Sequence, residues 1–164
     1  ASPNLQPLAT AGVSIEFATT VIRDPVAGPI RRTGGVCRAV TGLRLHPGTD
    51  RYDLEAALGR PGLQGFVLEG YGAGNGPTES WFLDPLRSAV DRGVTICITT
   101  QCRAGSVVGG LYASGSALLA TGAVSGGDMT FEAALTKLMV LTDRHGPDDV
   151  RRLMQQDMDG ELSV

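Results

Sequence analysis

The sequence of 164 residues has few of the side chains on which several classes of protein depend. It holds one lysine, Lys137, and its 14 basic residues are outnumbered by 17 acidic ones, which gives a net charge of −3. Because binding to a phosphate backbone requires a basic surplus, we expect no nucleic-acid partner. The sequence has three cysteines, an odd number without CxxC spacing, so it predicts no disulfide framework. Its two histidines and three cysteines also lack the spacing of metal ligands, so it predicts no metal site.

Long apolar runs and targeting signals are missing as well. The most apolar long segment, residues 104–124, is interrupted by glycines and hydroxyl side chains, so it favours packed small-residue structure over a membrane span. The first residues contain neither the basic run nor the apolar stretch of an export signal. We therefore expect a cytoplasmic location and no membrane partner.

What is present is a chain that is 42% hydrophobic and long enough for one domain. Apolar runs predict strands near residues 43–45, 65–69 and 94–99, and a further strand is expected earlier, at 13–22. Amphipathic stretches predict helices over 50–58, 80–92, 114–120, 130–141 and 147–156, with Asp50 and Thr130 as N-caps. This alternation predicts an α/β fold with a small, mostly parallel sheet flanked by helices on both faces.

Two glycine-bearing loops follow expected strands, at the edge of a parallel sheet where ligands usually bind. The first, residues 71–77, reads YGAGNGP, which matches neither the dinucleotide fingerprint nor a P-loop. Its one amide side chain, Asn75, offers both a donor and an acceptor to a polar ligand, or else stabilises the turn. The second loop carries Cys102, but the sequence places neither His46 nor His145 beside it as a base, so the alternative of an inert thiol stays open.

Several separated stretches resemble, in order and spacing, the carboxyl-terminal domain of cytoplasmic type I L-asparaginases. They are residues 65–77 (GFVLEGYGAGNGP), 100–102 (TQC), 112–115 (YASG) and 127–138 (GDMTFEAALTKL). The opening SPNLQPLA, residues 2–9, resembles the segment that links the two domains of that family, and residues 152–154 and 160–163 resemble its ending. The resemblance divides the chain into an interdomain linker with the strand that leads into the domain, residues 1–38, and an asparaginase-like C-terminal α/β domain, residues 39–164.

The resemblance implies a hydrolase that converts L-asparagine and water to L-aspartate and ammonia. In that family a threonine nucleophile acts through an acyl-enzyme without a cofactor, and the catalytic threonines, aspartate and lysine belong to the amino-terminal domain. We therefore expect no catalytic residue in this chain, no metal, and no activity from the chain alone. The implied partners are that amino-terminal domain, further copies in a homo-oligomer, and a small-molecule amide substrate.

The same resemblance implies site residues. Asn75 would reach across a subunit interface to the substrate, and Tyr112 would be a second contact from the same side. Some bacterial members bind asparagine at an effector site, whose positions here are Glu69, Thr100 and Cys102. Glu69 replaces an arginine of that site and would repel the carboxylate of the effector while attracting its ammonium group, so we do not expect allostery to follow automatically.

Two alternatives to the asparaginase interpretation remain. One is a binding or scaffold module that kept the fold and lost the chemistry. The other is the amidotransferase subunit that acts on misacylated glutaminyl-tRNA, which shares this architecture but is disfavoured by the acidic charge balance.

Overall fold

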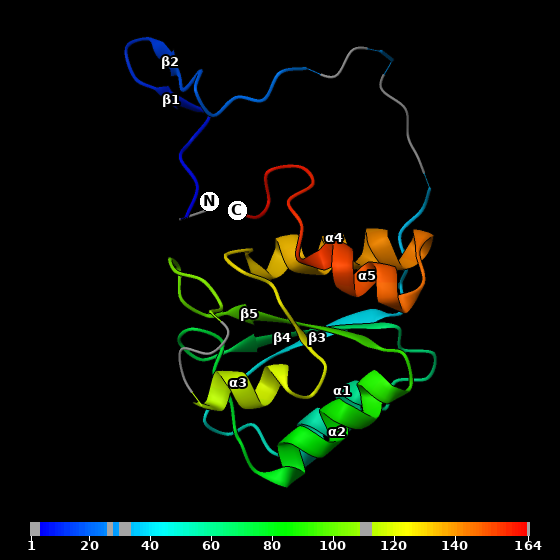
Figure 1. Ribbon diagram of the computed structural model, residues 1–164. Coiled ribbons are helices and arrows are strands. Elements are labelled where there is room, and N and C mark those ends of the chain that lie inside the picture. Colours follow the sequence, from blue (N-terminus) through cyan, green and yellow to red (C-terminus); the bar gives the residue numbers. More distant parts are fainter. Residues whose placement is uncertain (1–3, 26–27, 30–33, 109–112, 164) are drawn as a thin grey trace.

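A four-stranded parallel sheet, in the order β3-β4-β5-β6, forms the centre of the molecule (Figure 1). The computed structural model describes residues 4–25, 28–29, 34–108 and 113–163. The strands are β3 (Val40–Arg44), β4 (Gly65–Gly70), β5 (Thr95–Thr100) and β6 (Val124–Ser125). Val67 lies opposite Gly42 on one side and Cys97 on the other. The predicted α/β fold is therefore confirmed.

Helices cover both faces of the sheet, as predicted (Figure 1). One face carries α1 (Arg51–Leu58), α2 (Ser80–Asp91) and α3 (Ala113–Leu119), and the other carries α4 (Phe131–Arg144) and α5 (Pro147–Met154). Successive side chains of a strand point to opposite faces, so neighbouring residues serve different cores. Phe66 and Leu68 pack under the first set of helices, whereas Val67 packs under the second.

Both predicted helix caps are present. The Asp50 carboxylate accepts hydrogen bonds from the backbone N–H groups of Tyr52 and Asp53, and the Thr130 hydroxyl accepts one from Ala133. These bonds satisfy donors that the first turn of a helix otherwise leaves unpaired. Local sequence thus fixes where α1 and α4 begin.

The early part of the chain differs from the prediction. Instead of one strand at 13–22, it forms an antiparallel hairpin of β1 (Ala9–Ala11) and β2 (Ile15–Phe17), with Val13 in the turn. The backbone N–H of Gly12 donates to the Ser14 carbonyl and closes that turn. Only residues 15–17 of the expected strand are extended, because a second turn follows β2, in which the backbone N–H of Val21 donates to the Ala18 carbonyl at 3.0 Å.

The two-residue strand β6 was not predicted either, since it is too short for a periodic pattern. Within the described ranges, none of the helices combines the length and the apolar character that crossing a bilayer requires.

Gly42 of β3 packs against Phe131 of α4, and this contact generates a prediction. A methyl group at Gly42 would come within 2.7 Å of the Phe131 ring and 2.9 Å of the Val67 carbonyl oxygen. We expect Gly42→Ala to lower the free energy of unfolding by about 1–3 kcal/mol, as overpacking does, in a urea titration. Gly12→Ala, where the nearest atom is 3.8 Å away, is the matched control, and equal effects of the two variants would contradict this packing.

Candidate functional site

An open pocket of about 760 Å³ lies at the carboxyl-terminal edge of the sheet. The ends of β3, β4 and β5 supply Arg44, Glu69 and Thr100, and the first turn of α4 forms another wall. Further parts of the wall come from residues 4–5 near the start of the chain, from residues 101–103 after β5, from residues 128–130 before α4, and from residues 159–161 near the end of the chain. Its size and position are those of a small-molecule site in a parallel α/β fold.

The structure brings together Glu69, Thr100 and Cys102, the three residues that the sequence assigned to an effector site. All three line the pocket. The Thr100 hydroxyl donates a hydrogen bond to the Gly72 carbonyl and accepts one from the backbone N–H of Cys102 at 3.0 Å. Thr100 therefore ties the two glycine-bearing loops together, and the Cys102 side chain stays exposed on the pocket wall.

Glu69 contributes an acidic side chain to the lining of this pocket. Its side chain is only 13% exposed, and its one ion pair is with the largely exposed Arg44, at 3.5 Å. Burial raises the pKa of Glu69; the positive charge of Arg44 lowers it and the nearby Glu132 raises it, so that the pKa is raised overall. Carboxylates outnumber guanidinium groups in the lining of this pocket, so a cation is favoured there over an anion. The acidic residues are Glu69, Asp128, Glu132, Asp159 and Glu161, and the basic ones are Arg44 and Arg103.

Asn75 lies outside this pocket, in the turn after β4. Two backbone hydrogen bonds with Tyr71, of 2.8 and 2.7 Å, close the turn, and Gly74 has a φ of +88°. A side chain at Gly74 would meet Val107 at 2.7 Å, so the tight turn requires glycine. The Asn75 Oδ1 atom accepts a hydrogen bond from the Ser114 hydroxyl at 2.8 Å.

Tyr112, the second expected substrate contact, lies outside the described residues. Neither histidine lines the pocket that contains Cys102: His46 Nδ1 accepts from the backbone N–H of Gly48 at 3.1 Å, and His145 is exposed at the C-cap of α4. Burial raises the pKa of Cys97 to about 12, even though nearby Lys137 lowers it, so this thiol is not a nucleophile at neutral pH. In the part of the chain that the structure describes, no group of His, Cys, Asp and Glu side chains could hold a metal ion.

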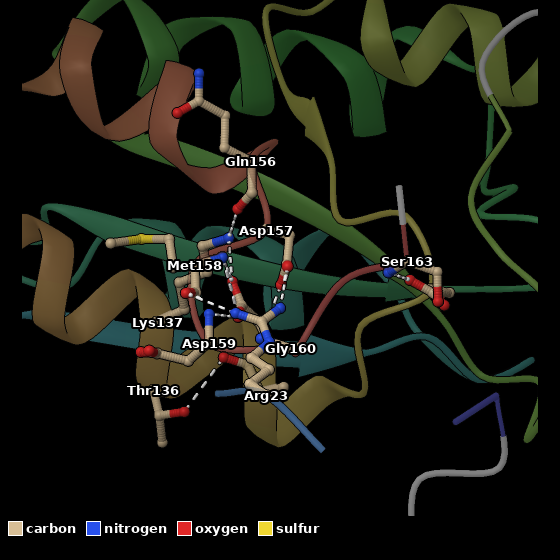
Figure 2. Close-up of polar contacts among 12 residues, drawn as sticks. Arg23, Thr136, Lys137, Gln156, Asp157, Met158, Asp159, Gly160 and Ser163 are labelled. Atoms are coloured by element: carbon tan, nitrogen blue, oxygen red, sulfur yellow. Dashed lines mark hydrogen bonds and ion pairs between the residues drawn. The ribbon is translucent and has the colours of Figure 1, made fainter. Parts of the chain in front are cut away.

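A contact that sequence reasoning missed holds one wall of the pocket in place (Figure 2). Lys137 projects from α4 and is 6% exposed at its side chain; its Nζ lies 2.6 Å from Glu161 Oε1 and also donates to the Gln156 carbonyl. Glu161 accepts further hydrogen bonds from the backbone N–H groups of Met158 and Asp159. The sequence did hold a signal, because Lys137 occurs within the apolar stripe of α4.

Burial alone would raise the pKa of Glu161, but the hydrogen bond from Lys137 and those from backbone N–H groups outweigh it and lower the pKa below its ordinary value. A second ion pair, between Arg23 and Asp157, ties the same tail to the early part of the chain. The tail, residues 155–163, is thus held by α4 and by the segment that precedes the domain.

Comparison with known proteins identifies the family to which the chain belongs. A family model described as the glutaminase/asparaginase C-terminal domain matches residues 39–154. The chain belongs to this family. The resemblance inferred from the sequence is therefore confirmed for the domain.

Asparaginase relatives match beyond the family model, across the whole chain. Over 99% of its length the chain is 35% identical to L-asparaginase 1 of Escherichia coli strain K12, of which it spans 48%. It is 41% identical to the 60 kDa lysophospholipase of Homo sapiens, of which it spans 28%. The crystal structure of L-asparaginase I from Vibrio cholerae covers all of this chain with a TM-score of 0.87 at 36% identity, and the match takes up 50% of that chain. The asparaginase-family domain thus spans half or less of these relatives.

The electrostatics of Glu69 generate a pH prediction. Folding raises the pKa of Glu69 above its ordinary value of 4.5. Above the raised pKa the Glu69 side chain is charged and its charge opposes folding, whereas below pH 4.5 it is mostly neutral and this cost is absent. We expect Glu69→Gln to raise the free energy of unfolding at pH 7 by less than about 1 kcal/mol, because Arg44 offsets part of the charge. This gain in unfolding free energy should vanish when thermal unfolding is measured below pH 4.5. If Glu69→Gln destabilised the protein at pH 7, the raised pKa of Glu69 would be contradicted.

The Lys137–Glu161 pair generates a second prediction. Glu161→Gln leaves a buried lysine without its counter-charge and should lower the free energy of unfolding at pH 7 by about 3 kcal/mol. Folding lowers the pKa of Glu161 below its ordinary value of 4.5. The difference in unfolding free energy between Glu161→Gln and the wild type should therefore be largest above pH 4.5 and should shrink as the pH falls through the lowered pKa of the folded state. Asp84→Asn breaks the exposed Arg87–Asp84 pair and is the control, expected to change stability by less than about 0.5 kcal/mol.

Proposed function

We propose that this chain is the C-terminal domain of an L-asparaginase, which converts L-asparagine and water to L-aspartate and ammonia. In this proposal the nucleophile belongs to an amino-terminal domain, and Asn75 completes the active site of a neighbouring subunit. Identities of 35% and 36% to two L-asparaginases, over nearly all of this chain, support it. The cytoplasmic homo-oligomer, and Tyr112 as a second substrate contact, are parts of the same proposal.

The geometry of Asn75 carries the proposal. Its backbone is fixed by the turn with Tyr71, and its Oδ1 atom is occupied by the Ser114 hydroxyl. A side-chain amide held in this way directs its N–H donors in a fixed direction without losing further rotamer entropy on binding. Such a donor suits the oxygen atoms of an amino-acid amide.

The proposal also assigns the pocket of Glu69, Thr100 and Cys102 to a regulatory ligand. The carboxylates of Glu69 and Glu132 in its lining would hold the ammonium group of such a ligand, and Arg44 and Arg103 are the basic side chains that its carboxylate could meet there. We therefore expect any effector response to differ from that of a site with an arginine in this position.

The charge distribution speaks against the tRNA-dependent amidotransferase alternative. Nucleic-acid binding needs basic side chains that are free to contact phosphate. Many arginines of this chain are instead engaged by carboxylates, namely Arg23, Arg44, Arg51, Arg87, Arg151 and Arg152.

The test supplies the absent domain. The half of E. coli L-asparaginase 1 that this chain does not match is joined to residue 1, and ammonia and aspartate are measured with L-asparagine as substrate. We expect turnover by the chimera and none by the chain alone. Asn75→Ala should lower kcat/KM by about 100-fold, the loss typical of a donor that stabilises the transition state.

Ser114→Ala, which frees the Asn75 side chain, should cause a smaller loss that shows mainly in KM. Gln155→Ala is the matched control, because this exposed amide contacts only the backbone of its own helix at 3.2 Å. A folded chimera without turnover would favour the scaffold alternative, and ammonia release by the unaided chain would contradict the division of labour.

A further inference from the structure

Thr100 is the last residue of β5 and lies beside the loop that carries Asn75. In the parallel register of the sheet it is opposite Gly70, the last residue of β4, and the loop of residues 71–77 begins directly after Gly70. Thr100 is only 7% exposed. Because its hydroxyl has little access to water, it depends on hydrogen-bond partners within the protein.

The Thr100 hydroxyl has two such partners, and they lie in different loops. It donates a hydrogen bond to the Gly72 carbonyl, and it accepts one from the backbone N–H of Cys102 at 3.0 Å. A hydroxyl has one donor and two acceptor sites, so both bonds form at once and together fix the direction of its proton. The carboxyl end of β5 is thereby bonded to the backbone of the turn that carries Asn75.

The turn has backbone freedom that a contact with the sheet can limit. Hydrogen bonds between the backbones of Tyr71 and Asn75 close the turn, but they lie within it. Gly72 and Gly74 have φ values of +48° and +88°, and neither has a Cβ atom to restrict its backbone. A turn with two such glycines opens and tilts through small changes in φ and ψ. The bond from Thr100 to Gly72 opposes these changes from outside the turn.

Other contacts act on different parts of the turn. The Ser114 hydroxyl bonds to the Asn75 Oδ1 atom, which orients the side chain and not the backbone. The Val107 side chain lies against Gly74, but an apolar contact is not directional. The Thr100 bond therefore supplies a directional link between the backbone of the turn and the sheet.

We propose that Thr100 is a positioning residue, whose hydroxyl holds the turn so that the Asn75 amide points at the substrate of a neighbouring subunit. This inference rests on the proposed function for the role of Asn75. Thr100 itself needs no contact with the substrate, because its hydroxyl donor is engaged by Gly72 and it acts through Asn75. A displacement of about 1 Å of a group that contacts the substrate lowers the rate of an enzyme by up to about 100-fold.

The experiment measures turnover of L-asparagine by the chimera with the E. coli amino-terminal half. Thr100→Val keeps the shape of the side chain and removes both hydrogen bonds, so we expect kcat/KM to fall about 10-fold, mainly through kcat. Thr100→Ser keeps the hydroxyl and should retain most of the activity. Thr99→Val is the matched control, because the buried Thr99 hydroxyl in the same strand has no hydrogen-bond partner among the described residues. This control should leave kcat/KM unchanged.

A double-mutant cycle separates positioning of Asn75 from a general effect on the fold. If Thr100 acts through Asn75, Thr100→Val has no further effect once Asn75 is replaced, and the double variant should lose about 100-fold, as Asn75→Ala does. Independent effects would instead multiply to roughly 1000-fold and overturn the proposal. Equal losses in Thr100→Ser and Thr100→Val, or in Thr99→Val and Thr100→Val, would overturn it too.

A second measurement requires no turnover. The backbone N–H groups of Gly74 and Asn75 both donate to the Tyr71 carbonyl, so their hydrogen exchange reports opening of the turn. In the isolated chain we expect Thr100→Val to accelerate this exchange at least about 5-fold and Thr99→Val to leave it unchanged. Equal exchange in wild type and Thr100→Val would overturn the positioning.

The two measurements distinguish this inference from the proposed function. Faster exchange in Thr100→Val, together with a wild-type chimera that is folded and inactive, would count against the proposed function and not against the hold of Thr100 on the turn. An active chimera that Thr100→Val leaves unimpaired would count against the positioning role alone.

Discussion

Burial of the central strands on both faces is the constraint on which the rest of this structure depends. Every residue of β5 is buried, and only Glu69 of β4 keeps partial exposure. Burying a polar side chain without a hydrogen bond costs free energy, and in β5 the buried Thr99 hydroxyl has no hydrogen-bond partner among the described residues. Polar chemistry is therefore confined to the strand ends, where Glu69, Thr100 and the Asn75 turn are found.

The wall of the pocket depends on a different interaction, the buried pair of Lys137 and Glu161. A lysine among Leu138 and Leu141 is costly unless its charge is compensated, and the tail supplies the compensation. The tail in turn reaches Arg23, so one set of contacts links the pocket wall, α4 and the segment that precedes the domain. The tail, residues 155–163, therefore holds both the pocket wall and the segment that precedes the domain in place.

The segment that precedes the domain has a defined structure of its own over part of its length. The sequence predicts a linker over residues 1–38, and the structure gives part of it the hairpin of β1 and β2, with anchors on the domain at Asn4 and Arg23. A plain linker would need no such anchors, since few contacts cross a flexible connection between domains.

Sequence alone determined the features that depend on neighbours along the chain. The caps at Asp50 and Thr130, the apolar strands and the glycine turn around Asn75 follow from local hydrogen bonding and periodicity, and the ordered motifs indicated the family. Tertiary structure decided which distant residues meet: Glu69 with Glu132, Lys137 with Glu161, and Arg23 with Asp157. These contacts join residues brought together only when the sheet and its helices pack, so neither spacing nor propensity encodes them.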